Sequence, residues 1–173
     1  MKGLTDVLRM ELEEEGAPIS VTLVKPSTID PPYLQHAKNY MAVDPKPPAP
    51  VYAPEVLANA VRWAAEHPIR DITIGGGGRL ITALGTALPR LTDFCMERAM
   101  ADAQRSETPA AERAGNLYAS AAEGGKERGG YRGHVMRSSA YTRAALSPGK
   151  ALIAAGLGLA VFAGIRSMAR SDD

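Results

Sequence analysis

Residues 2–26 read KGLTDVLRMELEEEGAPISVTLVKP, and the expected architecture follows from this stretch. Its apolar side chains recur every three or four positions, which predicts a helix over residues 2–15 that ends at Gly16. The apolar positions are Leu4, Val7, Leu8 and Leu12. Residues 19–24 are then rich in β-branched side chains and apolar on both faces. This pattern is typical of a strand that is buried in a parallel sheet.

Helix and strand patterns continue to alternate through residue 104. Pro54 opens an amphipathic pattern that should end near His67, and residues 71–74 predict a short strand. Two strands joined through a helix form one crossover unit, so the expected class is α/β. Residues 79–88 and 91–104 predict two further helices, because Pro89 interrupts the helical pattern between them. The proline-rich stretch from residue 26 to 50 shows little periodicity and predicts a long connection.

The order of these elements and their amino-acid sequences resemble the short-chain dehydrogenase/reductase family in the part that follows its catalytic Tyr-x-x-x-Lys. The resemblance covers residues 2–105. It rests on the helix, link and strand of residues 2–26, on Tyr52-Ala53-Pro54-Glu55-Val56, and on Asp71-Ile72-Thr73-Ile74-Gly75-Gly76. It implies the C-terminal remnant of a Rossmann-like, doubly wound parallel sheet, with about two strands plus helices. No N-capping residue precedes Lys2, so we expect its helix to be the second part of a longer one.

The family's cofactor site continues after the first of these strands, where this chain reads Pro26-Ser27-Thr28-Ile29-Asp30-Pro31. The resemblance implies residual cofactor contacts from Pro26, Ser27 and Ile29. Ser27 replaces the family's glycine, and Pro31 stands where the family has a threonine. The alternative is that these residues form an ordinary loop after the strand and contact no cofactor.

The sequence carries no catalytic residue of the family. No Thr-Gly-x-x-x-Gly-x-Gly turn is present, and none of the six tyrosines has a lysine four residues later. A member of the family would use NAD or NADP to move a hydride between a carbonyl and an alcohol. We expect this chain, taken alone, to bind neither nucleotide and to be catalytically incompetent.

No other motif in the sequence predicts a phosphate, metal or nucleic-acid binding site. Residues 75–78 are all glycine, but no Gly-Lys-Ser/Thr follows them, so a phosphate-binding loop is disfavoured. The three histidines lie too far apart in the sequence to predict a metal site. The net charge of +1 predicts no attraction to nucleic acid, despite a local basic run over residues 124–150.

From Ser106 the composition changes to Ala, Glu, Arg and Gly, which predicts a polar, flexible linker, disordered or loosely helical, over residues 106–148. Residues 149–168 predict an apolar helix, in which residues 151–165 carry no charge. A C-terminal membrane anchor with a cytoplasmic body is the favoured interpretation, and a buried packing helix is the alternative. The incompletely covered sheet edge also allows a homo-oligomer.

Two functional hypotheses follow. The first is the C-terminal portion of an NAD(P)-dependent short-chain dehydrogenase/reductase. The second is a non-catalytic, membrane-anchored interaction protein that keeps the sheet remnant as a docking surface.

Overall fold

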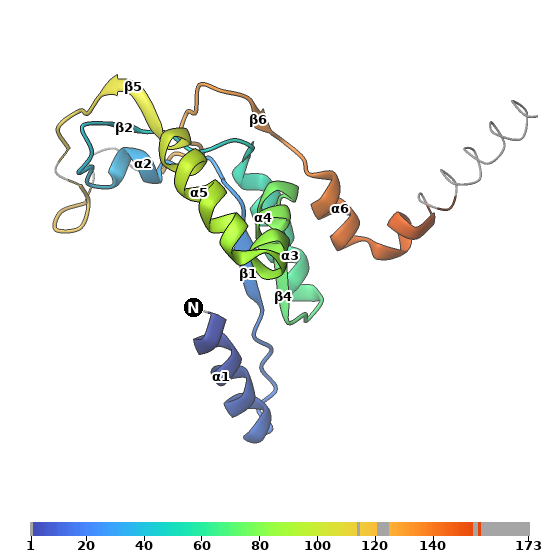
Figure 1. Ribbon diagram of the computed structural model, residues 1–173. Helices are drawn as coiled ribbons and strands as arrows, with labels where there is room; N and C mark the ends of the chain where they lie inside the picture. Colours follow the sequence, from blue (N-terminus) through green and yellow to red (C-terminus); the bar gives the residue numbers. More distant parts are fainter. Residues whose placement is uncertain (1, 114, 121–124, 154–155, 157–173) are drawn as a thin grey trace, which may run out of the picture.

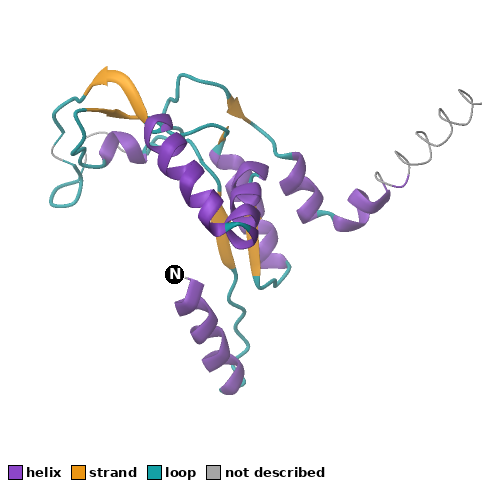
Figure 2. Ribbon diagram, viewed as in Figure 1, coloured by secondary structure: helices purple, strands orange, loops and turns teal. Residues whose placement is uncertain are grey.

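The computed structural model describes residues 2–113, 115–120, 125–153 and 156. Two short parallel strands stand at the centre of the molecule with helices beside them (Figures 1 and 2). The order of elements is helix, strand, helix, two strands, helix, strand, two helices, two strands and helix. The described part of the chain is therefore α/β, with short sheets, as the sequence predicts.

Helix α1 (Lys2–Glu14) ends where the sequence predicts. Gly16 takes a φ of 65°, and the Ala17 N–H donates to the Leu12 carbonyl at 2.9 Å, which closes the last turn. Figure 1 shows α1 standing apart from the other helices. Its apolar face is open, since Leu4 is 68% exposed and Met10 is 60% exposed.

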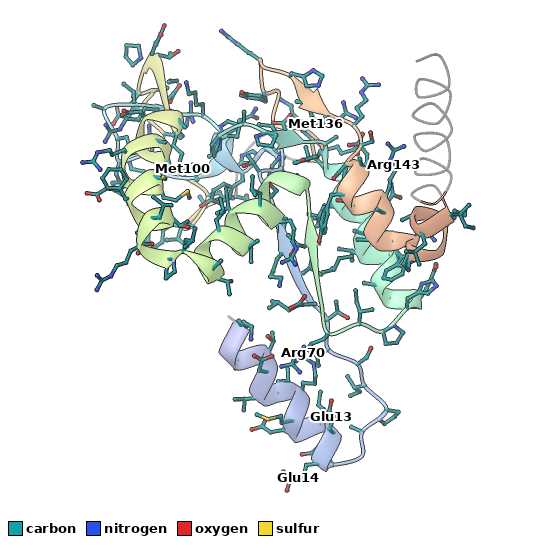
Figure 3. All side chains as sticks on the ribbon, turned by 45° about the vertical axis from the view of Figure 1, so that its right-hand side comes forward. Glu13, Glu14, Arg70, Met100, Met136 and Arg143 are labelled. Atoms are coloured by element: carbon teal, nitrogen blue, oxygen red, sulfur yellow. The ribbon has the colours of Figure 1, made fainter. Side chains whose placement is uncertain are left out.

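Polar contacts join α1 to the rest of the molecule. The Arg9 guanidinium donates to the carbonyls of Val21 at 2.9 Å and Arg70 at 3.1 Å. Asp6 accepts from Arg70 at 2.6 Å, and Figure 3 shows Arg70 beside this helix. A hydrogen bond from Lys2, ahead of the contribution of Arg9, holds the pKa of Asp6 below its ordinary range.

Strands β1 (Leu23–Pro26) and β4 (Asp71–Ile74) pair in parallel, with Leu23 opposite Asp71 and Pro26 opposite Ile74. The predicted second strand is confirmed, whereas β1 lies later than the predicted residues 19–24. The reason is the partner strand. Because β4 begins at Asp71, residues before Leu23 have no strand opposite them in this ladder.

Helix α3 (Pro54–Glu66) supplies the core with small and branched side chains. Val56 and Ala60 pack with Ile72 and Ile74 of β4, and these four residues form the buried cluster. Partly buried residues extend it, namely Val24, Leu57, Trp63, Ile69 and Leu146. Leu146 comes from the far end of the chain, so the core includes more than the crossover unit.

Helices α4 (Gly76–Ala87) and α5 (Pro89–Ala103) pack against each other. Pro89 separates them, as predicted, and occupies the first turn of α5, where its missing N–H costs nothing. Helix α4 begins three residues earlier than the predicted residue 79. The glycines that the sequence suggested as a turn are therefore partly helical.

Regular elements form among the described residues of 106–148, a segment for which the sequence predicts a polar, disordered or loosely helical linker. Strand β5 (Arg105–Pro109) pairs antiparallel with β2 (Val43–Pro45), and β6 (Val135–Met136) pairs in parallel with β3 (Val51–Tyr52). Helix α6 (Ala140–Leu146) starts at Ser139, whose side chain accepts the Thr142 N–H at 3.1 Å. The short helix α2 (Tyr33–His36) lies in the proline-rich connection. These elements are too short to show a periodic pattern, and distant partners stabilise them.

The structure does not support the predicted C-terminal apolar helix of residues 149–168 as a membrane anchor. Within the part of the chain that the structure describes, no helix combines the length and the apolar character needed to cross a membrane. The uncharged run of residues 151–165 is itself shorter than the roughly 20 residues that a span requires. Most of residues 149–168, namely 154–155 and 157–168, lies outside the described residues.

Candidate functional site

A cavity of about 720 Å³ opens beyond the carboxyl end of β1. Four segments line it: the residues that follow β1, the proline-rich stretch at β2, the region of β5, and residues 129–132. Ligands of open α/β sheets bind outside the carboxyl ends of the strands, and small-molecule sites have about this volume. This cavity is therefore the candidate site.

The three predicted cofactor contacts do not come together in it. Ile29 lines the cavity, as does its neighbour Thr28. Pro26 is exposed within β1, away from the lining residues. Ser27 is half-buried, and its N–H donates to the Ile74 carbonyl at 2.8 Å. The structure thus places one of the three at the cavity wall.

The glycine turn at residues 75–78 holds Ser27 instead. A Cβ on Gly75 would lie 2.7 Å from the Cβ of Ser27 and 2.7 Å from the ring of Tyr52. A Cβ on Gly78 would lie 3.0 Å from the Cβ of Ser27. Glycine is required here because the chain after β1 passes directly over the start of α4. Gly75 also has a φ of 91°, which a side chain would strain.

The first two N–H groups of this turn have side-chain partners. The Gly75 N–H donates to the Thr142 hydroxyl at 2.9 Å, and the Gly76 N–H donates to the Tyr52 hydroxyl at 3.1 Å. Thr142 is 2% exposed and Tyr52 is 3% exposed. A phosphate bound by these two N–H groups would have to displace both hydroxyls.

Asp30 joins the loop after β1 to the C-terminal segment. It is 6% exposed, and its carboxylate accepts the Tyr131 N–H at 3.3 Å. Its own carbonyl accepts the Gly129 N–H at 3.0 Å. A Cβ on Gly129 would lie 2.5 Å from the Pro31 carbonyl oxygen, so only glycine allows this approach. One wall of the cavity therefore belongs to residues far along the chain.

Asp44 and Arg113 fix the opposite wall. Their side chains form an ion pair at 3.0 Å and are only 22% and 27% exposed. Arg113 also donates to the Leu34 carbonyl at 2.8 Å, so it joins β2 to the helix α2 region. The Lys46 N–H donates to the Gln104 carbonyl at 2.9 Å, which continues the contact towards α5.

Glu55, in the first turn of α3, binds Arg128 beside the same C-terminal segment. The hydrogen bond from its own backbone N–H, followed by the one from Arg128, lowers the pKa of Glu55 below its ordinary value of 4.5. The same pair raises the pKa of Arg128. This contact holds residues 128–131 against the sheet end without entering the cavity.

The residues present fit NAD or NADP incompletely. The only family contact at the cavity is Ile29, and the two leading N–H groups of the glycine turn are occupied by Thr142 and Tyr52. We therefore derive no catalytic step through a nicotinamide cofactor. Among the described residues, no group of three or more His, Cys, Asp or Glu side chains is placed to hold a metal ion.

Sequence reasoning missed the residues that build the cavity. Asp30, Asp44, Arg113 and Tyr131 stand in segments without periodicity, and their partners lie up to 101 positions away. Only Asp30 had a local signal, because it directly follows the segment that resembles the cofactor site. A single sequence contains no signal that identifies the distant contact partners of the other three residues.

Comparisons with known proteins give one informative relative. No protein family model matches the chain, and no solved structure matches it. A protein of Bacillus subtilis (strain 168) named "Uncharacterized oxidoreductase YxnA" is 42% identical over 149 residues, which is 86% of this chain. The chain spans 42% of the length of that relative. The similarity fits an oxidoreductase family.

Proposed function

We propose that this chain contributes the C-terminal α/β part of a short-chain dehydrogenase/reductase that uses NAD or NADP in carbonyl and alcohol chemistry. The observation that supports it is the parallel pair of β1 and β4, whose carboxyl end runs through Ile29 into a cavity of about 720 Å³. The relative named as an oxidoreductase matches this region. The finer family assignment comes from the sequence resemblance.

In this proposal the chain shapes the substrate end of the site and does not perform the chemistry alone. The general acid Tyr and its Lys partner have no counterpart in this sequence. Ile29 and Thr28 form the floor of the cavity, and residues 129–132 form part of its wall. The nucleotide contacts would come from residues outside this chain.

Two binding measurements test the proposal. The chain alone is titrated with NAD and with NADP to about 1 mM by calorimetry, where even binding of roughly 4 kcal/mol registers. We expect no saturable heat. In a chimera, the residues of the Bacillus subtilis relative that match this chain are replaced by those of this chain. We expect that chimera to bind one of the two nucleotides.

A matched pair of variants makes the chimera informative. Ile29→Asp places a charge at the floor of the cavity and should weaken nucleotide or substrate binding, whereas Ile81→Asp on exposed α4 should not. A folded chimera that binds neither nucleotide would contradict the proposal. It would favour a non-catalytic interaction protein instead.

A further inference from the structure

We propose that the cavity binds a small ligand with an apolar body and one anionic group, and that Lys46 and Arg132 select it. The inference rests on the proposed function only for the ligand's role as a substrate. Binding itself depends on side chains of this chain alone. The two cations come from segments 86 positions apart, one at the end of β2 and one after the Asp30 contact.

The charges that line the cavity leave a positive excess. Three cations and two carboxylates are present: Lys46, Arg113 and Arg132 against Asp30 and Asp44. Asp44 is paired with Arg113 at 3.0 Å, and Asp30 accepts the Tyr131 N–H at 3.3 Å. Within the described residues, Lys46 and Arg132 have no ion-pair or side-chain hydrogen-bond partner. Both are exposed, so they can reach a ligand at the mouth of the cavity.

The remaining wall carries both polar and apolar side chains. Hydroxyl and amide groups come from Thr28, Gln35, Gln104, Ser106 and Thr108. Ile29 and Leu34 contribute aliphatic surface, and Tyr33 and Tyr131 contribute aromatic rings. Pro31, Pro45, Pro47 and Pro48 also line the cavity, and proline offers no backbone N–H. An apolar ligand body can pack on this aliphatic, aromatic and proline part of the wall, where a polar body would lose hydrogen bonds to water.

The two features together define the ligand class. An apolar body would pack on the proline and aromatic wall, while its anionic group would pair with Lys46 and Arg132. A ligand with a cationic group would meet two like charges and be excluded. Because Arg132 and the adjoining wall follow α5, part of the selectivity resides in the segment that the sequence suggested as a linker, and the rest in Lys46 at the end of β2.

Octanoate and octanamide are the probes, because they share one chain length and differ in charge. The full chain is titrated with each to about 10 mM by calorimetry. We expect octanoate to bind more tightly than octanamide. The double substitution Lys46→Gln and Arg132→Gln should weaken octanoate binding about three- to tenfold, the range for two exposed ion pairs, and leave octanamide unchanged.

The control variant carries Arg79→Gln and Arg90→Gln, which remove the same charge from exposed positions of α4 and α5 that do not line the cavity. It should bind octanoate like the unmodified chain. Equal binding of both probes, no saturable heat with either, or an equal loss in the control variant would overturn the proposal. This outcome is independent of the nucleotide titrations, so failure of one proposal is distinguishable from failure of the other.

Discussion

Thr142 joins helix α6 to the centre of the molecule through one hydroxyl. Its Oγ1 accepts the Gly75 N–H at 2.9 Å, and the residue is 2% exposed. Thr142→Val keeps the shape and removes the acceptor, which leaves a buried N–H without a partner. We expect a loss of about 1–3 kcal/mol in the free energy of unfolding, measured by urea titration with circular dichroism.

Thr86→Val is the matched control. Its hydroxyl donates to the Thr82 carbonyl at 2.9 Å on an exposed face of α4, so the change should stay within about 0.5 kcal/mol. Equal effects of the two substitutions would show that Thr142 contributes no more than an ordinary surface hydroxyl. The sequence gives no hint of this difference, because Thr142 stands in a basic run with no apolar periodicity.

At the scale of elements, the Glu55–Arg128 pair makes the attachment of the C-terminal segment to α3 dependent on pH. The folded-state pKa of Glu55 is lowered, so its contribution to stability is fully present above the ordinary value of 4.5. The contribution is lost as the pH falls through the lowered folded-state pKa. We expect protection of the Gly129 amide, which donates to the Asp30 backbone carbonyl, from hydrogen exchange to decrease across this acidic range.

Glu55→Gln should remove most of that pH dependence and lower the protection already at neutral pH. Glu66→Gln, at the other end of α3 in a pair with Arg62, is the control, and it should leave the Gly129 amide unchanged. A Gly129 amide whose exchange follows the same pH profile in the Glu55 variant would exclude this pair as the cause. The profile must be compared after correction for intrinsic exchange at each pH.

The elements differ in how much of them the sequence could predict. Helix α3 and strand β4 follow directly from Pro54, from apolar periodicity and from the run at residues 71–74. Strands β2, β3 and β6 are two or three residues long, so no periodic pattern can reveal them. They form because a distant segment supplies the hydrogen-bond partner. The cavity was missed for the same reason, since two of its walls come from residues 104–132.

For the whole molecule, the consequence is a small core that depends on the C-terminal segment. Its buried cluster consists of Val56, Ala60, Ile72 and Ile74, and Leu146 of α6 packs against it. Val51 is fully buried although β3 is only two residues long, because β6 lies beside it. Small residues bury little apolar area, so each added contact is a large part of the total stability.

A chain of residues 1–105 should therefore be less stable than a chain of residues 1–153. The shorter chain lacks β6 and α6, exposes Val51 and Tyr52, and leaves the Gly75 N–H without the Thr142 hydroxyl. We expect a loss of at least about 2 kcal/mol in the free energy of unfolding, together with a broader urea transition. Circular dichroism follows the transition, and sizing checks that both chains are in the same state of association. Adding residues 106–153 as a separate peptide should recover part of the loss, because the segment binds only the folded form. Identical midpoints for the two chains would mean that residues 1–105 fold independently and that the C-terminal segment is a passive addition.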